Sequence, residues 1–232
     1  MDERFLITGA ARGLGLAMTR QLLDKGAHIS ALVRAPNEAL RELEARYGGR
    51  LDTYSGDVTD DDSIKKLFGA IADKHGALDT IINNAVTYLD HGQPKLEEID
   101  LSIFARTFEV NSVGPLRVLK HGLSLLRKGQ RKLIVNVSSE AGSIGQSWRK
   151  AEYAYCMSKS ALNMGSSIVQ NYVAPEGIKV LVLHPGWFNS SGTGRAPISA
   201  EQASVRVLET ILKPHTLEGP TYLDLDGKPL PW

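Results

Sequence analysis

Tyr155 and Lys159 stand four residues apart, a spacing that puts both side chains on one face of a helix. A phenol with a pKa near 10 needs about 4 kcal/mol of differential stabilisation to titrate near pH 7. A cation about 4 Å away supplies roughly 1 kcal/mol in water and about 4 kcal/mol at an effective dielectric constant near 20. Lys159 could therefore activate Tyr155 as a general acid or base only in a partly desolvated pocket. By itself, such a pair is usually a surface coincidence.

A serine at a strand end provides a partner for this pair. The apolar run 133–137 ends in Ser138 and Ser139, shortly before the helix that carries Tyr155. Residues just past the strands of a doubly wound sheet lie where its ligands bind. Ser143 lies in the same loop and is a second candidate. Its position directly after the strand favours Ser139.

Asn111 provides a further candidate because Pro115 follows it by four residues within a helical pattern. Proline has no N–H, so the carbonyl of Asn111 loses its normal intrahelical partner. The resulting kink is expected to leave a backbone oxygen and the amide side chain free to hold an ordered water. That water could link Lys159 to solvent. A packing kink without a chemical role is the alternative.

The chain also carries a glycine-rich turn near its first residues. The apolar run Phe5–Thr8 is followed by Gly9, Arg12, Gly13, Leu14 and Gly15, and a helical pattern then begins. Glycines at this spacing let the backbone approach a pyrophosphate, which rests against the positive end of the helix dipole. A dinucleotide site is predicted, with an ordinary strand-to-helix turn as the alternative.

Two arginines indicate which dinucleotide binds. Arg34 follows the second apolar run, where a site for NAD commonly has Asp or Glu, and Arg12 lies inside the glycine loop. Two converging guanidinium groups repel unless an anion lies between them, and a 2′-phosphate matches their geometry. Each arginine alone would be read as a solvated surface residue. Together they favour NADP(H) over NAD(H).

Two other strand ends hold smaller candidates. Asp57 and Val58 follow the third run, where a carboxylate could accept a hydrogen bond from the adenine amino group or simply start a helix. Asn84, Ala85 and Val86 follow the fourth run. Small and amide side chains there permit close approach of a cofactor, although a turn is the simpler explanation.

The elements that must position these residues alternate along the chain. Strand-like runs are predicted at Phe5–Thr8, Ile29–Val33, Leu51–Ser55, Leu78–Asn83, Leu133–Val137, Val180–Leu183 and Thr221–Leu225. Helical periodicity is found at 14–26, 37–47, 60–75, 100–127, 155–174 and 199–213. This alternation predicts one α/β domain over residues 1–232, a doubly wound (Rossmann) fold. It has a seven-stranded, mostly parallel sheet with helices on both faces.

The composition excludes several classes of function. The 232 residues hold 27 Lys and Arg against 26 Asp and Glu, so no net field favours nucleic acid or an anionic membrane. No apolar run approaches the roughly 20 residues that span a bilayer. The single cysteine, Cys156, predicts a reducing, cytoplasmic location. The six histidines are scattered, so no metal site is expected.

Taken together, these positions resemble the short-chain dehydrogenase/reductase family over essentially the whole chain. The matching positions are Thr8, Gly9, Gly13, Gly15, Asp57, Asn83-Asn84-Ala85, Asn111, Ser138-Ser139, Tyr155, Lys159 and Pro185-Gly186. The ending from Tyr222 to Trp232 looks like the C-factor-like, carbonyl-reductase-like branch.

The resemblance implies a role for each matching residue. Tyr155 would be the general acid in reduction, and Ser139 would hydrogen-bond the substrate oxygen. Lys159 would bind the nicotinamide ribose and lower the pKa of Tyr155, and Asn111 would anchor a relay water. The cofactor site would comprise Thr8, Gly9, Arg12, Gly13, Leu14, Gly15, Arg34, Asp57, Val58, Asn84, Ala85, Val86, Tyr155, Lys159, Pro185, Gly186 and Ser190. Val86 departs from the glycine usual in the family, and Ser190 replaces a common threonine.

The resemblance also implies the activity and the partners. The expected activity is an NADPH-dependent exchange of hydride with a small carbonyl or alcohol substrate. Trp148, Trp187, Phe188 and Tyr88 are placed to line its pocket, although such aromatic residues are as often simple packing. A homodimer or homotetramer is expected through the helices at 100–127 and 155–174. The alternative function is a dinucleotide-binding signalling or regulatory protein with little turnover.

Overall fold

A computed structural model describes residues 2–90, 95–189, 196–219 and 221–232 of the chain. Seven parallel strands form one sheet in the order β3-β2-β1-β4-β5-β6-β9. Their bounds are β1 Arg4–Thr8, β2 His28–Val33, β3 Leu51–Ser55, β4 Thr80–Asn83, β5 Leu133–Val137, β6 Lys179–Leu183 and β9 Tyr222–Leu223. The predicted doubly wound parallel sheet is confirmed.

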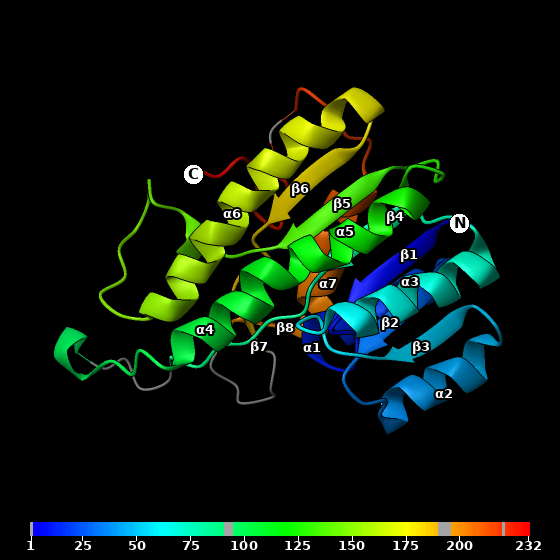
Figure 1. Cartoon of the computed structure of the whole chain (residues 1–232), viewed down its shortest axis with the longest axis horizontal. Helices are drawn as coiled ribbons and strands as arrows, with labels where there is room; N and C mark the ends of the chain where they lie inside the picture. Colours follow the sequence, from blue (N-terminus) through cyan, green and yellow to red (C-terminus); the bar gives the residue numbers. More distant parts are fainter. Residues whose placement is uncertain (1, 91–94, 190–195, 220) are drawn as a thin grey trace.

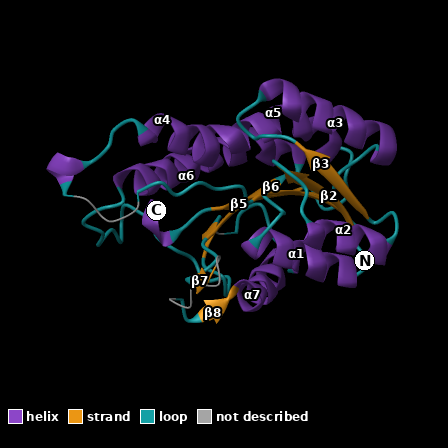
Figure 2. Ribbon diagram, turned by 90° about the horizontal axis from the view of Figure 1, so that it is seen from below, coloured by secondary structure: helices purple, strands orange, loops and turns teal. Residues whose placement is uncertain are grey.

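Helices cover both faces of the sheet. The long helices are α1 Gly13–Asp24, α2 Glu38–Tyr47, α3 Asp61–His75, α5 Gly114–Leu126, α6 Tyr153–Val173 and α7 Ala200–Leu212. Figure 2 shows α3, α5 and α6 on one side of the sheet and α1, α2 and α7 on the other. Across the described residues, no helix is long and apolar enough to cross a membrane.

The apolar character of the strands explains these two layers. Phe5, Leu6 and Ile7 in β1 have no exposed surface. Because successive side chains of a strand point to opposite faces, Phe5 and Ile7 pack into the core beneath α1 and α7. Leu6 packs into the second core, beneath α3 and α5. Burial on both faces requires continuous apolar runs, as this sequence has.

The predicted helix at 100–127 is interrupted. It comprises α4 Ile103–Phe108, a π-helical segment η2 Glu109–Val113, and α5. The amide of Gly114 bonds the carbonyl of Glu109, five residues back, and Pro115 follows at the start of α5. Pro115 cannot donate to the carbonyl four residues earlier, so a regular helix cannot continue through this point.

Smaller differences from the predictions lie near the last strand. Only Tyr222 and Leu223 of the predicted strand Thr221–Leu225 pair with β6. Two short strands were not predicted, β7 Phe188–Asn189 and β8 Ile198–Ser199, which pair with each other. Two-residue strands carry no detectable periodicity. The carboxyl ends of the main strands meet at one edge of the sheet (Figure 1), which is where ligands of this fold bind.

Candidate active site

Ser139 lies at this edge, just beyond β5 and at the start of a short 3-10 helix, η3 Glu140–Gly142. The Tyr222 hydroxyl donates to the Ser139 carbonyl at 2.6 Å and fixes its backbone. A Cβ at Gly142 would lie 2.8 Å from the Lys159 carbonyl carbon, so glycine lets η3 pack directly on α6. The Ser143 hydroxyl instead donates to the Pro231 carbonyl at 2.7 Å. Contact of Ser139, rather than Ser143, with the substrate stays a prediction.

The helix that carries Tyr155 is capped by a distant residue. Glu152 at the N-cap of α6 has a left-handed backbone and provides no side-chain cap. The buried carboxylate of Asp90 does so instead, accepting from the Ala154 amide at 2.7 Å and from the Tyr155 amide at 3.4 Å. Satisfying otherwise unpaired amides of the first turn fixes where α6 begins. Asp90 therefore positions Tyr155.

Burial dominates the electrostatics of the tyrosine. It raises the pKa of Tyr155 to about 12, while hydrogen bonding by the Ser139 side chain lowers the pKa by a smaller amount. The Tyr88 ring packs edge-on against the Tyr155 ring, with centroids 5.2 Å apart. The phenol is therefore protonated near neutral pH, as a proton donor must be.

Lys159 occupies the desolvated position that the sequence argument requires. It is 2% exposed, its Nζ donates to the Val137 carbonyl at 2.8 Å, and the same atom lies 5.8 Å from the centroid of the Tyr155 ring. Burial lowers the pKa of Lys159 to about 7. The expected lowering of the Tyr155 pKa towards neutrality is not seen, because the desolvation that would strengthen the lysine charge also raises the pKa of the phenol.

The expectation that the Asn111 side chain is free was wrong. Its amide oxygen accepts from the Thr87 amide at 2.8 Å, and its amide nitrogen donates to the Thr87 carbonyl at 2.9 Å and to Ser158 Oγ at 3.0 Å. A buried amide must find such partners to avoid a desolvation cost. The side chain joins the segment after β4 to α6, and the binding of a relay water by the Asn111 backbone stays a prediction.

A cluster of charged residues beside Ser139 was missed by the sequence analysis. Ser139 Oγ donates to Glu140 Oε2 at 2.7 Å, and Arg149 forms ion pairs with both Glu140 and Glu152. His184 Nδ1 lies 3.3 Å from the same oxygen of Glu140. An acidic residue immediately after a predicted catalytic serine was the available signal.

The glycine loop fits a dinucleotide phosphate. A Cβ at Gly15 would lie 2.4 Å from the Gly9 carbonyl oxygen, and one at Gly9 would lie 2.9 Å from the Cα of Ala85. Only glycine therefore permits this close packing. The first turn of α1 has no acidic residue, and its N-cap, Arg12, gives no side-chain cap. Its amides are thus oriented to receive an anion.

Two of the predicted cofactor residues hold this loop in shape. The Thr8 hydroxyl accepts from the amides of Asn84 and Ala85, each at 3.0 Å. The Asn84 side chain donates back to the carbonyls of Thr8 and Gly9. These hydrogen bonds hold the ends of β1 and β4 together. The Leu14 side chain is buried in the core, so this residue can offer only its backbone to a ligand of the loop.

Arg12 and Arg34 lie on loops that a hydrogen bond joins. Asn37 Nδ2, in the segment after β2, donates to the Ala11 carbonyl at 2.6 Å. Both arginine side chains are exposed. The two arginine side chains therefore lie on neighbouring loops, one of which is the glycine loop.

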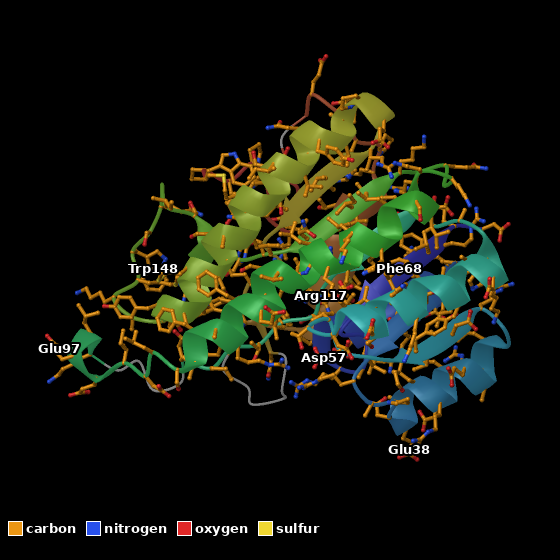
Figure 3. All side chains as sticks on the ribbon, viewed as in Figure 1. Glu38, Asp57, Phe68, Glu97, Arg117 and Trp148 are labelled. Carbon is orange, nitrogen blue, oxygen red and sulfur yellow. The ribbon has the colours of Figure 1, made fainter. Side chains whose placement is uncertain are left out.

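The remaining predicted cofactor residues that the structure describes lie at the same edge of the sheet. Figure 3 labels Asp57 just beyond β3, where its carboxylate accepts from Thr59 and pairs with Arg106 at 3.1 Å. Arg117 of α5 donates to the Val58 carbonyl at 2.6 Å. Val86 is 52% exposed, and Pro185 is buried beyond β6 beside Gly186. Ser190 lies outside the described residues. Contact of these residues with a cofactor stays a prediction.

Of the four aromatic residues predicted to line the substrate pocket, only Tyr88 has a described contact with Tyr155. Tyr88 lies against Tyr155, as expected of a residue beside the substrate. Trp148 and Trp187 are exposed, the former on the loop before α6 (Figure 3), and Phe188 packs against the core.

Comparison with known proteins places the chain in a family. A family model described as short chain dehydrogenase matches residues 3–199. The chain belongs to the short-chain dehydrogenase/reductase family. A dehydrogenase of Rhodococcus sp. (strain AD45), named for 1-hydroxy-2-glutathionyl-2-methyl-3-butene, is 30% identical and covers 98% of both chains. The C-signal protein of Myxococcus xanthus is 35% identical over 68% of this chain and 94% of its own.

Solved structures agree with this placement in the carbonyl-reductase-like branch of the family. The carbonyl reductase Sniffer of D. melanogaster superposes with a TM-score of 0.92 at 28% identity, covering 100% of both chains. An NADPH-bound carbonyl reductase from chicken fatty liver has a TM-score of 0.90 at 25% identity, over 100% of this chain and 99% of its own. Membership identifies the chain as an oxidoreductase that uses a nicotinamide cofactor and acts on alcohol or carbonyl groups of small molecules.

Proposed function

We propose that this protein is an NADPH-dependent reductase of carbonyl compounds, with Tyr155 as the general acid. The observation that carries the proposal is the convergence of Ser139, Tyr155 and Lys159 at the carboxyl edge of the sheet, the edge that also holds the glycine loop. When bound there, a nicotinamide cofactor supplies the hydride. A pure binding protein needs no such proton-transfer set, so the signalling alternative is not favoured.

The three side chains divide the work on the substrate. Tyr155 donates its proton to the carbonyl oxygen, and a donor hydrogen bond from Ser139 stabilises the charge that develops there. Lys159 holds the nicotinamide ribose and, when charged, stabilises the phenolate that remains. Falling NADPH absorbance with a panel of aldehydes and ketones tests the proposal. Tight NADPH binding without turnover of any carbonyl would refute it.

The two exposed arginines support a preference for NADPH. Arg12→Ala and Arg34→Ala are each expected to weaken NADPH binding about 10-fold to 100-fold, the effect of losing a charge-assisted hydrogen bond, and to leave NADH binding unchanged. The dissociation constants are measured by fluorescence titration. Arg20→Ala, an exposed arginine of α1, is the matched control. Equal wild-type affinities for the two cofactors would contradict the phosphate argument.

A stripe of exposed apolar side chains supports self-association into a homodimer or homotetramer. Met157, Met164, Ile168 and Tyr172 recur along one face of α6 and are 51–64% exposed. Leu116 of α5, which is 45% exposed, lies beside this stripe. We expect Ile168→Asp to lower the mass measured by sedimentation equilibrium to that of a monomer, because a carboxylate would be desolvated in the interface.

The control for this test lies on the other side of the sheet. Val205 of α7 is 45% exposed, and Val205→Asp should leave the mass unchanged. A monomeric wild type would contradict the proposal.

A cytoplasmic location stays a prediction from the single cysteine.

A further inference from the structure

The Ser139 hydroxyl has only one proton, and in this structure that proton is directed at the carboxylate of Glu140. Ser139 Oγ accepts from the Ala141 amide at 3.2 Å and donates to Glu140 Oε2 at 2.7 Å. A hydroxyl provides one donor and two acceptor sites. What remains on Ser139 is therefore an acceptor site, which the Tyr155 hydroxyl can use, whereas a carbonyl oxygen needs a donor.

Glu140 is held as a carboxylate, the strongest competitor for that proton. Burial raises its pKa, but hydrogen bonds from Ser139 and Arg149, together with the charges of His184 and Arg149, outweigh burial and leave the pKa below its usual value. The Glu140 side chain is only 19% exposed. Other titratable groups near it are the hydroxyls of Tyr155 and Tyr222.

Glu140 has its own partners whether or not it binds Ser139. Oε1 pairs with Arg149, which Glu152 also holds in place, and Oε2 faces both Ser139 and His184. Because the carboxylate is fixed from both ends, its position does not depend on the substrate. Nδ1 of His184 is buried and has no hydrogen-bond partner among the described residues.

We propose that Glu140 is a positioning residue that competes with the substrate carbonyl for the hydrogen bond donated by Ser139. This competition restrains carbonyl reduction. The proposal rests on the proposed function, because the restraint acts on the donor that a carbonyl substrate uses. Reduction then requires the Ser139 hydroxyl to turn its hydrogen bond from the Glu140 carboxylate to the substrate oxygen. Substrates whose oxygen accepts strong hydrogen bonds are favoured by this exchange.

Glutamine at position 140 has nearly the shape of glutamate but can donate a hydrogen bond to Ser139 Oγ, where the carboxylate accepts one. In Glu140→Gln, Oε1 can keep its contact with Arg149, while Nε2 can donate to Ser139 Oγ. The Ser139 proton is then free to point at a substrate. We expect kcat/KM for NADPH-dependent reduction of 4-nitrobenzaldehyde to rise about five-fold, since a charge-assisted hydrogen bond no longer opposes the exchange.

Two further variants separate this effect from a general loss of charge. Glu152→Gln neutralises the other carboxylate on Arg149 without touching Ser139, and kcat/KM should not rise. In a Ser139→Ala background, Glu140→Gln should have no effect on the residual rate, because the group through which it acts is missing. An unchanged or lower kcat/KM in Glu140→Gln, or the same rise in the Ser139→Ala background, would overturn the proposal.

A titration tests the hydrogen bond without turnover. The carboxyl ¹³C signal of Glu140, assigned by its loss in Glu140→Gln, reports the pKa of this group. Ser139→Ala should raise that pKa because a donor to the carboxylate is lost, whereas Ser143→Ala, whose hydroxyl bonds Pro231, should not. No change in Ser139→Ala would refute the inference. Absence of carbonyl turnover in the wild type would refute the proposed function alone.

Discussion

Tyr155→Phe is expected to lower kcat for carbonyl reduction by about 1,000-fold, because it removes the proton donor and leaves the ring in place. Tyr155 has a pKa of about 12 in this structure, so the phenol is fully protonated at pH 6–9. The rate of reduction by the wild type should therefore not fall on the alkaline side of this range because of this residue. Alcohol oxidation requires the phenolate and should accelerate as the pH rises. Steady-state kinetics in both directions test these expectations.

The neighbouring tyrosine of α6 provides a control for this substitution. The Tyr153 hydroxyl donates to the Lys150 carbonyl at 3.4 Å and is not directed at Ser139. Tyr153→Phe should keep the wild-type kcat. A Tyr155→Phe protein that retains more than about a tenth of the activity would exclude Tyr155 as the general acid.

Lys159→Met is expected to reduce kcat about 100-fold and to stabilise the fold. Lowering the pKa of Lys159 from the ordinary value of 10.5 to about 7 corresponds to roughly 5 kcal/mol of disfavoured burial of the charged form. Methionine fills similar apolar volume but leaves the Val137 carbonyl without its donor, which costs about 1–3 kcal/mol. The net gain is about 2 kcal/mol or more at pH 7 and below.

The sign of the pH dependence follows from proton counting. Between pH 7 and 10.5, the unfolded chain carries the Lys159 proton and the folded chain does not, so the stability of the wild type rises with pH across this window. The advantage of Lys159→Met should therefore be largest at pH 6 and shrink towards pH 10. Urea unfolding at these two pH values measures the difference. A difference in stability that does not depend on pH would contradict the buried-charge argument.

Much of the fold was predictable because its signals are local. A buried parallel strand needs an unbroken apolar run, and the runs at Phe5–Thr8 and Leu133–Val137 coincide with β1 and β5 to within one residue. The predicted length of the last strand was too great, because an apolar run shows that a segment is buried but not how many of its residues pair with a neighbouring strand. The helix at 100–127 was correctly placed, but its π-helical segment depends on how the chain relieves the missing donor of Pro115.

The sequence by itself determined the chemistry that this edge of the sheet can hold. Glycine spacing is a backbone property, and the Tyr155–Lys159 spacing is set by the helix, so both could be interpreted without knowing what packs against them. The family resemblance rests on the same local motifs.

Only the tertiary structure decided how those groups are oriented and charged. Asp90 caps the helix of Tyr155 from a segment more than 60 residues earlier, and Glu140 accepts the hydrogen bond that the Ser139 hydroxyl donates. The depth at which Lys159 lies sets its pKa. Hydrogen-bond direction and desolvation depend on which distant segments enclose a group, because both act over a few ångströms of space and not along the chain.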